Sequence, residues 1–397
     1  MISGIPYWRL SAFYLCYFAV LGAMVPYWPV YLQERGFSAQ TIGELTAIMM
    51  VARVIAPNLW GWLADHTSQR IRIVRGGAVI ATLAFAAIFL DQSYGWLVLV
   101  ICLYSFFWNA LLAQYEVVTF DYLKNQPQGY ARIRLWGSVG FIVAVAGIGA
   151  LFDVIEVAHL PLLLVGLMLL VCASSWLVEE APRHEHPDSS NETLWQIMKK
   201  PAVLCFFGVC LLMQVSHGPY YTFFSLYMEQ HHYSRSQIGQ LWALGVIAEV
   251  VLFWYMHRLM PQWGVRSLML LSLLLSSLRW ALIGYFPDSL PVMLFAQCLH
   301  AFSFGAFHAT AIEVVRRAFP AKQAARGQAL YNSLSFGVGN AIGALGSGYL
   351  WEWSNRWTFL IASAITLLAW VIAWWGLKEA YTASTLKGSE PFKAKGL

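Results

Sequence analysis

Long apolar runs separated by short polar stretches form the dominant pattern of this chain. Glycine, proline and charged residues interrupt the runs, whose length is close to the roughly 20 residues that a helix needs to cross a bilayer. Segmenting the chain on this length predicts spanning helices at residues 8–32, 41–64, 73–91, 95–120, 132–152, 158–178, 202–228, 237–257, 266–286, 290–315, 327–351 and 356–377. We therefore expect an all-α membrane protein with twelve transmembrane helices.

The composition strengthens this prediction. Of the 397 residues, 59% are hydrophobic and 11% are charged, whereas a soluble domain carries about 25% charged residues. The first apolar run is longer than the core of a signal peptide, and no small-residue cleavage site follows it, so we expect a retained helix. The six cysteines all lie in predicted spans, which favours buried apolar side chains over disulfides. We expect neither a metal nor a cofactor.

Basic residues are distributed unevenly between the connecting loops. Of the 25 Lys and Arg residues, 20 fall in one set of loops and termini, and Arg35, Arg235 and Arg356 fall in the other. Because basic loops stay in the cytoplasm, we expect both termini there, in a multi-pass protein of the cell inner membrane. This distribution explains the net charge of +5 without a nucleic-acid partner.

The two halves of the chain share sequence motifs. The motif at 37–45 recurs at 233–241, and the motif at 115–118 recurs at 312–315. Parallel repeats of this kind are typical of secondary transporters, which bind substrate between the repeats near the midplane. We predict two pseudo-symmetric six-helix bundles: an N-terminal bundle at 1–178, a cytoplasmic linker at 179–201, a C-terminal bundle at 202–380 and a cytoplasmic tail at 381–397.

A few charged residues lie inside or at the ends of predicted spans. An ionised side chain at the middle of a bilayer costs about 2.5–3.5 kcal/mol, so such groups usually pair or line a cavity. Arg53 and Glu249 occupy equivalent positions of the two halves, and Glu116 and Arg134 flank a turn at 127–129. We predict a shared cavity in which Arg53, Glu116 and Arg134 bind substrate. Structural ion pairs, with Arg134 reaching toward the interface, are the alternative.

Histidines and aromatic residues accompany these charges. His300 and His308 lie near one helical face, and histidine changes charge near neutral pH. We predict a proton relay of Glu249, Arg279, His300 and His308, with hydrogen-bonded core histidines as the alternative. We also predict substrate contacts at His217 and at a wall of aromatic side chains. This aromatic wall comprises Tyr27, Trp28, Trp136, Tyr220, Tyr221 and Trp242. The alternative is that the wall residues are ordinary core or lipid-facing aromatic residues.

The loop between spans two and three carries a family resemblance. Residues 61–65, Gly-Trp-Leu-Ala-Asp, followed by Arg70 and Arg72, resemble the signature loop of the major facilitator superfamily, although His66 stands where that loop usually has a base. The resemblance implies a gating role for Gly61, Asp65 and Arg70. Glu313 repeats Glu116 in the second half but lies close to two arginines, so we expect a gating ion pair there.

A closer resemblance, over nearly the whole chain, is to the phenylpropionate permease family and its neighbours, the oligosaccharide and nucleoside proton symporters. Residues 26–28, 132–138, 217–221, 245–250, 278–280 and 299–300 carry it. In lactose-permease-like symporters, residues similar to Glu116 and Arg134 bind substrate, and residues similar to Arg279 and His300 couple the proton. That pattern has a proton-carrying Glu one turn beyond the His, where this chain has Ser303. Another group must then carry the proton.

Motifs of soluble catalysis are missing from the sequence, which has no Gly-x-Ser-x-Gly, no His-Glu-x-x-His and no P-loop. We therefore predict no enzyme but a monomeric secondary transporter that takes up a small aromatic carboxylate together with a proton. Its partners are the substrate, the proton and the lipid bilayer. A proton symporter for a sugar or nucleoside is the alternative, followed by a drug or metabolite exporter. A membrane-embedded transferase and a receptor on a transporter fold are alternatives from other classes.

Overall fold

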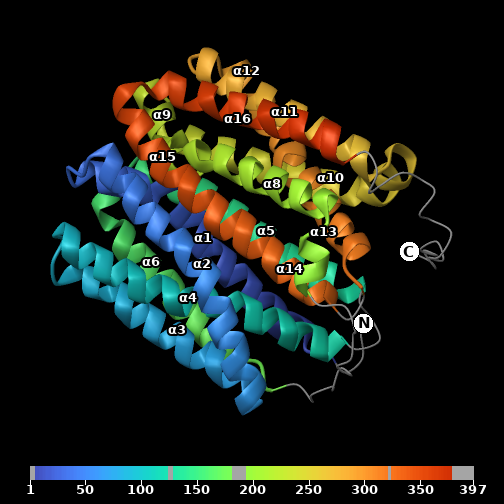
Figure 1. The fold of residues 1–397 in the computed structure, drawn as a ribbon. Helices are drawn as coiled ribbons and strands as arrows, with labels where there is room; N and C mark the ends of the chain where they lie inside the picture. The colour runs from blue at the N-terminus through green and yellow to red at the C-terminus, as the bar shows by residue number, and fades with distance from the viewer. Residues whose placement is uncertain (1–4, 124–127, 181–193, 321–322, 378–397) are drawn as a thin grey trace.

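Helices form nearly all of the chain in the computed structural model, which describes residues 5–123, 128–180, 194–320 and 323–377 (Figure 1). The first half forms α1 (Tyr7–Glu34), α2 (Ala39–Thr67), α3 (Arg70–Ala86), α4 (Tyr94–Leu123), α5 (Gln128–Phe152) and α6 (Leu160–Ser175), with the short turns η1 (Ala87–Phe89) and η2 (Val157–His159). Figure 1 shows α3 and α4 in the lower part of the view, with α1 above them.

The second half forms more elements because several of its spans are interrupted. They are α7 (Leu194–Met198), α8 (Pro201–Ser216), α9 (Gly218–Gln230), α10 (Arg235–Trp263), α11 (Val265–Tyr285), α12 (Leu290–Cys298), η3 (Ala301–Ala306), α13 (Phe307–Ala318), α14 (Ala324–Asn332), η5 (Ser333–Gly339), α15 (Asn340–Trp353) and α16 (Asn355–Gly376). Within the described residues, eleven helical runs are long and apolar enough to span a membrane. The predicted span at 327–351 corresponds to the consecutive elements α14, η5 and α15. The predicted all-helical membrane fold is confirmed.

Three of the interruptions are local changes of helical geometry. Span seven breaks between α8 and α9, where Pro219 stands in the first turn of α9 and has no N–H to continue the preceding ladder. Spans ten and eleven contain the π-helical segments η3 and η5. Segments of this type are rare and frequently occur at functional sites. The predicted boundaries of these spans hold, but the sequence pattern does not show the breaks.

The sequence repeat produces the same helix start in both halves. Ser38 precedes α2 and Ser234 precedes α10, each with extended backbone at φ −67°. Each serine side chain accepts a hydrogen bond from the backbone N–H three residues later, at 3.2 Å, from Thr41 or Gln237. This cap satisfies an N–H group that the helix itself leaves without an acceptor.

Glycines allow the two halves to pack closely through two helix pairs, α2 with α15 and α5 with α10. A Cβ atom on Gly43 of α2 would lie 2.8 Å from the carbonyl oxygen of Ala344 in α15. A Cβ atom on Gly239 of α10 would lie 2.4 Å from the carbonyl oxygen of Val145 in α5. Both distances are shorter than a real Cβ contact, so each close approach requires the small residue.

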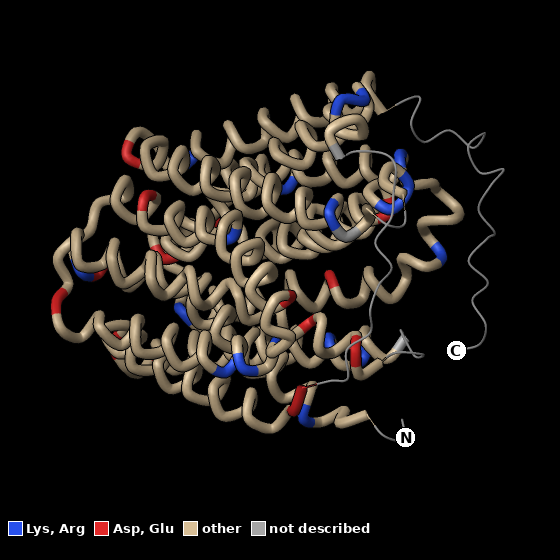
Figure 2. The backbone as a smooth tube through the Cα atoms, turned by 60° about the horizontal axis from the view of Figure 1, so that its bottom comes forward, with Lys and Arg blue, Asp and Glu red and all other residues tan. Residues whose placement is uncertain are grey.

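Charged residues lie mostly toward the ends of the helices, and a few lie along their length (Figure 2). Residues 181–193 of the predicted linker and the predicted tail at 381–397 lie outside the described residues. The exact limits of the two bundles therefore remain predictions.

Candidate functional site

Arg279 of α11 is a fully buried cation held by polar groups of the neighbouring helices. Its Nη1 donates to His300 Nδ1 at 3.0 Å and to Ser303 Oγ at 2.9 Å. Its Nη2 donates to Gln297 Oε1 at 3.1 Å, and the hydroxyl of Tyr220 donates to the same oxygen at 2.9 Å. These acceptors compensate part of the cost of burying a guanidinium group.

The contact with Arg279 determines the tautomer of His300. A guanidinium has no acceptor, so His300 Nδ1 must be the acceptor, and the ring proton is on Nε2. Nε2 lies 3.5 Å from the Oε2 atom of Glu249, which comes from α10. Arg279, His300 and Glu249 thus form a chain of a cation, an imidazole and a carboxylate drawn from three helical elements. We refer to these three residues as the buried triad.

The π-helical segment η3 positions the rings that follow His300. The ring of Phe304 stacks on His300 at 5.6 Å and on His308 at 5.9 Å, with interplanar angles of 12° and 13°. His308 Nδ1 is also 3.1 Å from the hydroxyl of Tyr331. Both histidines do lie along one side of the segment, but Phe304 fills the space between them, while Ser303 turns toward Arg279.

Aromatic rings of the C-terminal half surround Arg279. Its guanidinium carbon lies 4.1 Å from the ring centre of Tyr220 and 4.6 Å from that of Trp280, which are favourable cation–π distances. The ring of Trp242 lies 4.4 Å from Tyr220 and 6.3 Å from Tyr221. Tyr220, Tyr221 and Trp242 from the predicted wall are therefore brought together beside the buried triad.

His217 lies at the break between α8 and α9 and is fully buried. Its Nδ1 is 2.8 Å from the carbonyl oxygen of Met213, so Nδ1 carries the proton. Its ring packs edge-on against Trp280 at 5.0 Å and stacks on Tyr221 at 5.6 Å. His217 therefore packs against the aromatic side chains that lie beside the buried triad.

Glu116 and Arg134 are neighbours but do not form a direct ion pair in the structure. Glu116 Oε1 accepts a hydrogen bond from the hydroxyl of Tyr130 at 2.9 Å, and the guanidinium of Arg134 lies 3.8 Å from the ring centre of Phe18. The guanidinium also lies 6.0 Å from the ring centre of Tyr14, whose hydroxyl donates to Thr119, three residues after Glu116 in α4. Glu116 and Arg134 are therefore placed on neighbouring helices of the N-terminal half.

Arg53 lies half-buried in the middle of α2. The next residue, Val54, lies against Gly337 of η5 in the other half. Within the part of the chain that the structure describes, Arg53 forms neither a hydrogen bond nor an ion pair. It is a cation near the boundary of the halves with its hydrogen-bond donors free.

Three predicted wall residues lie elsewhere. The hydroxyl of Tyr27 donates to the carbonyl oxygen of Val145 at 2.8 Å, at the contact between α1 and α5. Trp28 stacks on Tyr31 at 5.3 Å in the core of the N-terminal half. Trp136 donates its indole N–H to the hydroxyl of Tyr7 at 2.9 Å. These three residues are not among the aromatic side chains around Arg279.

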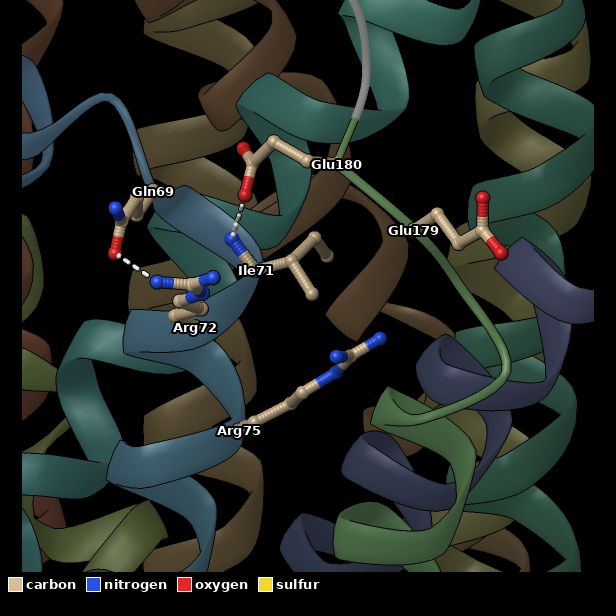
Figure 3. Close-up of a pocket in the computed structure, with 6 residues that line it drawn as sticks. All are labelled: Gln69, Ile71, Arg72, Arg75, Glu179 and Glu180. Carbon is tan, nitrogen blue, oxygen red and sulfur yellow. Dashed lines mark hydrogen bonds between the residues drawn. The ribbon is translucent and has the colours of Figure 1, made fainter.

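Arg70 of the predicted gating loop connects three segments of the N-terminal half. Its Nη2 lies 2.5 Å from Asp65, and its Nη1 donates to Gln114 of α4 at 2.7 Å. The carboxylate of Glu180 accepts the backbone N–H of Arg70 at 3.1 Å and that of Ile71 at 2.9 Å, at the start of α3 (Figure 3). The beginning of the linker is therefore anchored to α3.

The remaining two gating predictions are Gly61, at the start of the same motif, and Glu313 of α13. A Cβ atom on Gly61 would lie 3.8 Å from the side-chain nitrogen of Gln114, so Gly61 faces the same contact between α2 and α4. Glu313 accepts hydrogen bonds at 2.7 Å from Arg316 and Arg317 of its own helix. This ion pair does not bridge the two halves.

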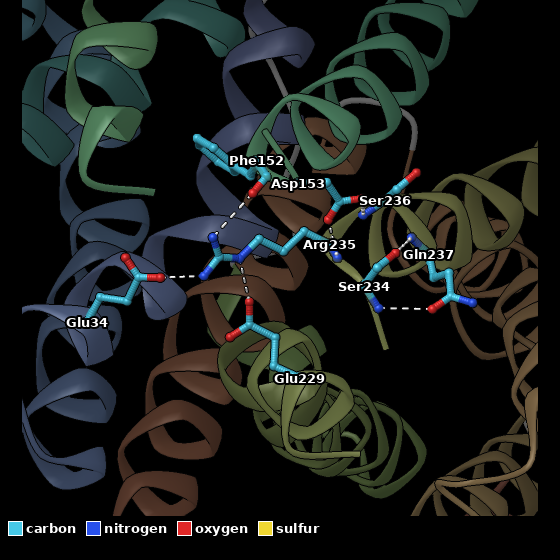
Figure 4. A network of polar contacts seen from close by, with 8 residues as sticks. All are labelled: Glu34, Phe152, Asp153, Glu229, Ser234, Arg235, Ser236 and Gln237. Atoms are coloured by element: carbon cyan, nitrogen blue, oxygen red, sulfur yellow. Dashed lines mark hydrogen bonds and ion pairs between the residues drawn. The ribbon is translucent and has the colours of Figure 1, made fainter. Parts of the chain in front are cut away.

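Arg235 at the start of α10 forms a polar network between the halves that the sequence patterns do not indicate (Figure 4). Its guanidinium pairs with Glu34 of α1, and with Glu229 of α9 at 2.8 Å. Its backbone N–H donates to Asp153 Oδ1 at 2.9 Å, and Nη1 donates to the carbonyl oxygen of Phe152 at 3.3 Å. In the sequence, Arg235 stands out only as one of three basic residues in a set of loops that is otherwise free of Lys and Arg.

The hydrogen bonds that join the two halves, among the described residues, all lie at one end of the molecule. Besides the Arg235 network and the bond from Ser236 N to Asp153, Gln40 of α2 bonds Glu352 and Tyr349 of α15. Within the described residues, every hydrogen bond between 5–180 and 194–377 belongs to this group, at the ends of helices on the face away from the chain termini. We call this set of contacts the loop-side closure.

A family model described as the MFS_1 like family matches residues 7–361. The chain belongs to this family of major facilitator transporters. It is 30% identical over 366 residues to a probable 3-phenylpropionic acid transporter of Escherichia coli (strain K12), with 91% of this chain and 95% of that protein covered.

Two further relatives place this transporter among bacterial permeases. It is 26% identical over 381 residues to the maltose permease of Geobacillus stearothermophilus, covering 94% of this chain and 95% of that one. Its fold matches a crystal structure of the nucleoside transporter NupG with a TM-score of 0.78 and 17% sequence identity, over 94% of this chain and 99% of that one. The protein is therefore a multi-pass transporter of the inner membrane and not an enzyme, as the sequence predicts.

Proposed function

We propose that this transporter takes up a small aromatic carboxylate together with a proton, by alternating exposure of a site between its two halves. The observation that carries the proposal is the buried triad, in which Glu249 and His300 adjoin the cation Arg279 inside the membrane. A carboxylate and an imidazole in contact can exchange a proton as the surrounding charges change. The likeness to a probable 3-phenylpropionic acid transporter and the free cation Arg53 support the cargo class.

Glu249 is the member of the triad that we propose carries the proton. His300 accepts from Arg279 at Nδ1, so a second ring proton would require that hydrogen bond to break. Glu249 has no such restriction, and in its protonated form it needs no compensating charge. The family pattern expects a carboxylate beyond His300, where Ser303 stands; in our proposal a carboxylate from α10 takes its place.

We further propose that both termini are cytoplasmic and that the protein acts as a monomer. The concentration of basic residues on the terminal side supports this orientation. The loop-side closure would then shut the site off from the outside. Binding of cargo and proton would release these contacts, and the two bundles, 1–178 and 202–380, would move relative to each other.

Uptake into proteoliposomes tests the proposal. Wild-type protein should accumulate labelled 3-phenylpropionate when a pH gradient is imposed with the acidic side outside. Glu249→Gln should lose this accumulation but keep substrate counterflow, because the neutral amide imitates the protonated state. Glu156→Gln, in an exposed loop, is the matched control and should accumulate normally. Wild-type protein without pH-driven accumulation of any aromatic carboxylate would refute the proposal.

A second candidate function is proton-coupled transport of a sugar or nucleoside. The presence of Glu116 favours it, since this carboxylate already accepts a hydrogen bond from the hydroxyl of Tyr130 and can accept others from cargo hydroxyls. The similarity to the maltose permease is a further reason to consider it. Competition separates the two functions, because only a sugar or nucleoside carrier would be inhibited by maltose or uridine and be insensitive to aromatic acids.

A further inference from the structure

The first turn of α10 is capped from both halves of the molecule (Figure 4). Within its own half, Ser234 accepts the N–H of Gln237 at 3.2 Å, and the side chain of Gln237 accepts the N–H of Ser234 at 2.9 Å. The two N–H groups between them donate to Asp153 of the other half, from Arg235 at 2.9 Å and from Ser236 at 3.2 Å. The first four N–H groups of a helix have no acceptor within the helix. Two of these four are therefore satisfied only through contact with the other half.

The start of α2 repeats this arrangement. Ser38 accepts the N–H of Thr41 at 3.2 Å, and the N–H of Gln40 donates to Glu352 of the other half at 3.3 Å. Glu352 lies in the last turn of α15, 199 residues after Asp153, which directly follows α5. These two helices form the fifth spans of their halves. Two carboxylates at equivalent positions of the repeat therefore each cap a helix of the opposite half.

Glycines set the same register at both contacts. A Cβ atom on Gly149 of α5 would lie 2.5 Å from the carbonyl oxygen of Arg235, the first residue of α10. A Cβ atom on Gly348 of α15 would lie 2.9 Å from the carbonyl oxygen of Ala39, the first residue of α2. Each glycine precedes the capping carboxylate of its half by four residues, about one helical turn. The glycine brings the partner helix close, and the carboxylate one turn later meets its first N–H groups.

We propose that Asp153 and Glu352 are positioning residues for transport, because each completes the cap of a helix in the opposite half only while the loop side is closed. A carboxylate at a helix N-terminus is stabilised by the hydrogen bonds and by the partial positive charge there. Opening on the loop side separates α5 from α10 and α2 from α15, and it leaves these N–H groups to water. The two caps therefore favour the closed state.

The two caps differ in strength. Among the described residues, Asp153 accepts two backbone N–H groups and Glu352 accepts one. The guanidinium of Arg235 pairs with Glu34 and Glu229 beside the first cap, whereas Ala39 occupies the equivalent position at the second cap. The Asp153 cap should therefore hold the closed state more firmly than the Glu352 cap.

Double electron–electron resonance tests this role in the whole chain, reconstituted in nanodiscs without cargo and without the native cysteines. Spin labels at Leu90 and Leu290, exposed residues of the two halves on the loop side, report the opening. Asp153→Ala should raise the ratio of open to closed populations about 2- to 30-fold, the range expected for loss of a helix cap. Glu352→Ala should raise it less, because one hydrogen bond is lost. Asp153→Asn keeps one acceptor oxygen and should fall between the wild type and Asp153→Ala.

The double variant and a control separate a gating role from a structural one. In Asp153→Ala with Glu352→Ala the two factors should multiply, because both caps restrain the same movement from separate places. Glu156→Ala is the matched control, since Glu156 is an exposed acid three residues beyond Asp153 whose side chain caps no helix. This variant should keep the wild-type distances.

Each contrary outcome has a distinct meaning. A lower thermal midpoint of Asp153→Ala with wild-type distances overturns the proposal, because the role of Asp153 is then purely structural. An equal change in Glu156→Ala also overturns it, because the effect is then one of surface charge. The role of the caps rests on the alternating exposure proposed above but on neither the cargo nor the proton. Unchanged distances in Asp153→Ala therefore leave the proposed function intact if the wild type opens with 3-phenylpropionate. A wild type that never opens refutes alternating exposure and the role of the caps together.

Discussion

Replacing Arg235 with Gln should release the loop-side closure. The variant loses the ion pair with Glu34 and the hydrogen bond to the carbonyl of Phe152, both of which cross between the halves. It keeps the backbone N–H bond to Asp153. The side chains of Arg235 and Glu34 are 24% and 39% exposed, so the ion pair is partly screened and contributes about 0.5–1 kcal/mol.

The hydrogen bond to the carbonyl adds about 0.5–1.5 kcal/mol. The total, about 1–2.5 kcal/mol, corresponds to a shift of roughly 5- to 70-fold in the equilibrium toward the state that is open on the loop side. Double electron–electron resonance can measure this shift with spin labels at Val154 and Leu290, exposed residues of the two halves on that face. The longer distance should gain population in the variant, in a background without the native cysteines.

Arg35→Gln is the matched control, because Arg35 packs on Tyr31 of its own half. An unchanged distance distribution in Arg235→Gln would refute the reasoning. So would an equal change in Arg35→Gln, because that result would assign the effect to loss of positive charge on the surface and not to the contacts between the halves.

Further predictions concern the site, the packing and a loop. Ser303→Ala removes one acceptor of the Arg279 guanidinium and should lower the free energy of unfolding by about 1 kcal/mol. Uptake driven by a pH gradient should persist in this variant. Loss of that uptake would mean that Ser303 takes part in proton coupling. Gly43→Val places a side chain against the carbonyl of Ala344 and should reduce uptake more than tenfold in a transport assay at normal expression; wild-type uptake would show that the close approach of α2 and α15 is dispensable. The hydroxyl and backbone N–H of Ser93 hold the pKa of Asp91 below its ordinary value, so this contribution to stability is present above the ordinary pKa and is lost as the pH falls through the lowered one. Thermal melts of Asp91→Asn should therefore differ from the wild type at neutral pH and converge at acid pH, and a constant difference would contradict this origin.

The sequence predicts the helices well because their length and hydrophobicity are local properties. The interruptions at His217, in η3 and in η5 were not predicted, because π-helical turns and mid-span breaks depend on contacts with neighbouring helices. The repeated motif that contains Ser38 and Ser234 forms the same helix start in both halves, because an N-cap needs only one side chain and a local backbone.

The candidate site was predicted only in part. Arg279, His300 and Glu249 were grouped by their charge within spans and by family resemblance, and the structure brings them into contact. Arg235 was missed because its role depends on segments that meet only in the folded protein.

Coupled proton movement during transport is the most direct test of the central claim, that a carboxylate–histidine pair inside the membrane links the proton to the cargo. A pH-sensitive dye inside proteoliposomes reports protons entering with 3-phenylpropionate. Wild-type protein should acidify the interior when this acid is added outside, after correction for passive entry of the protonated acid in protein-free liposomes. Glu249→Gln should exchange the acid without acidification. Acidification by the variant at the wild-type rate would contradict the claim.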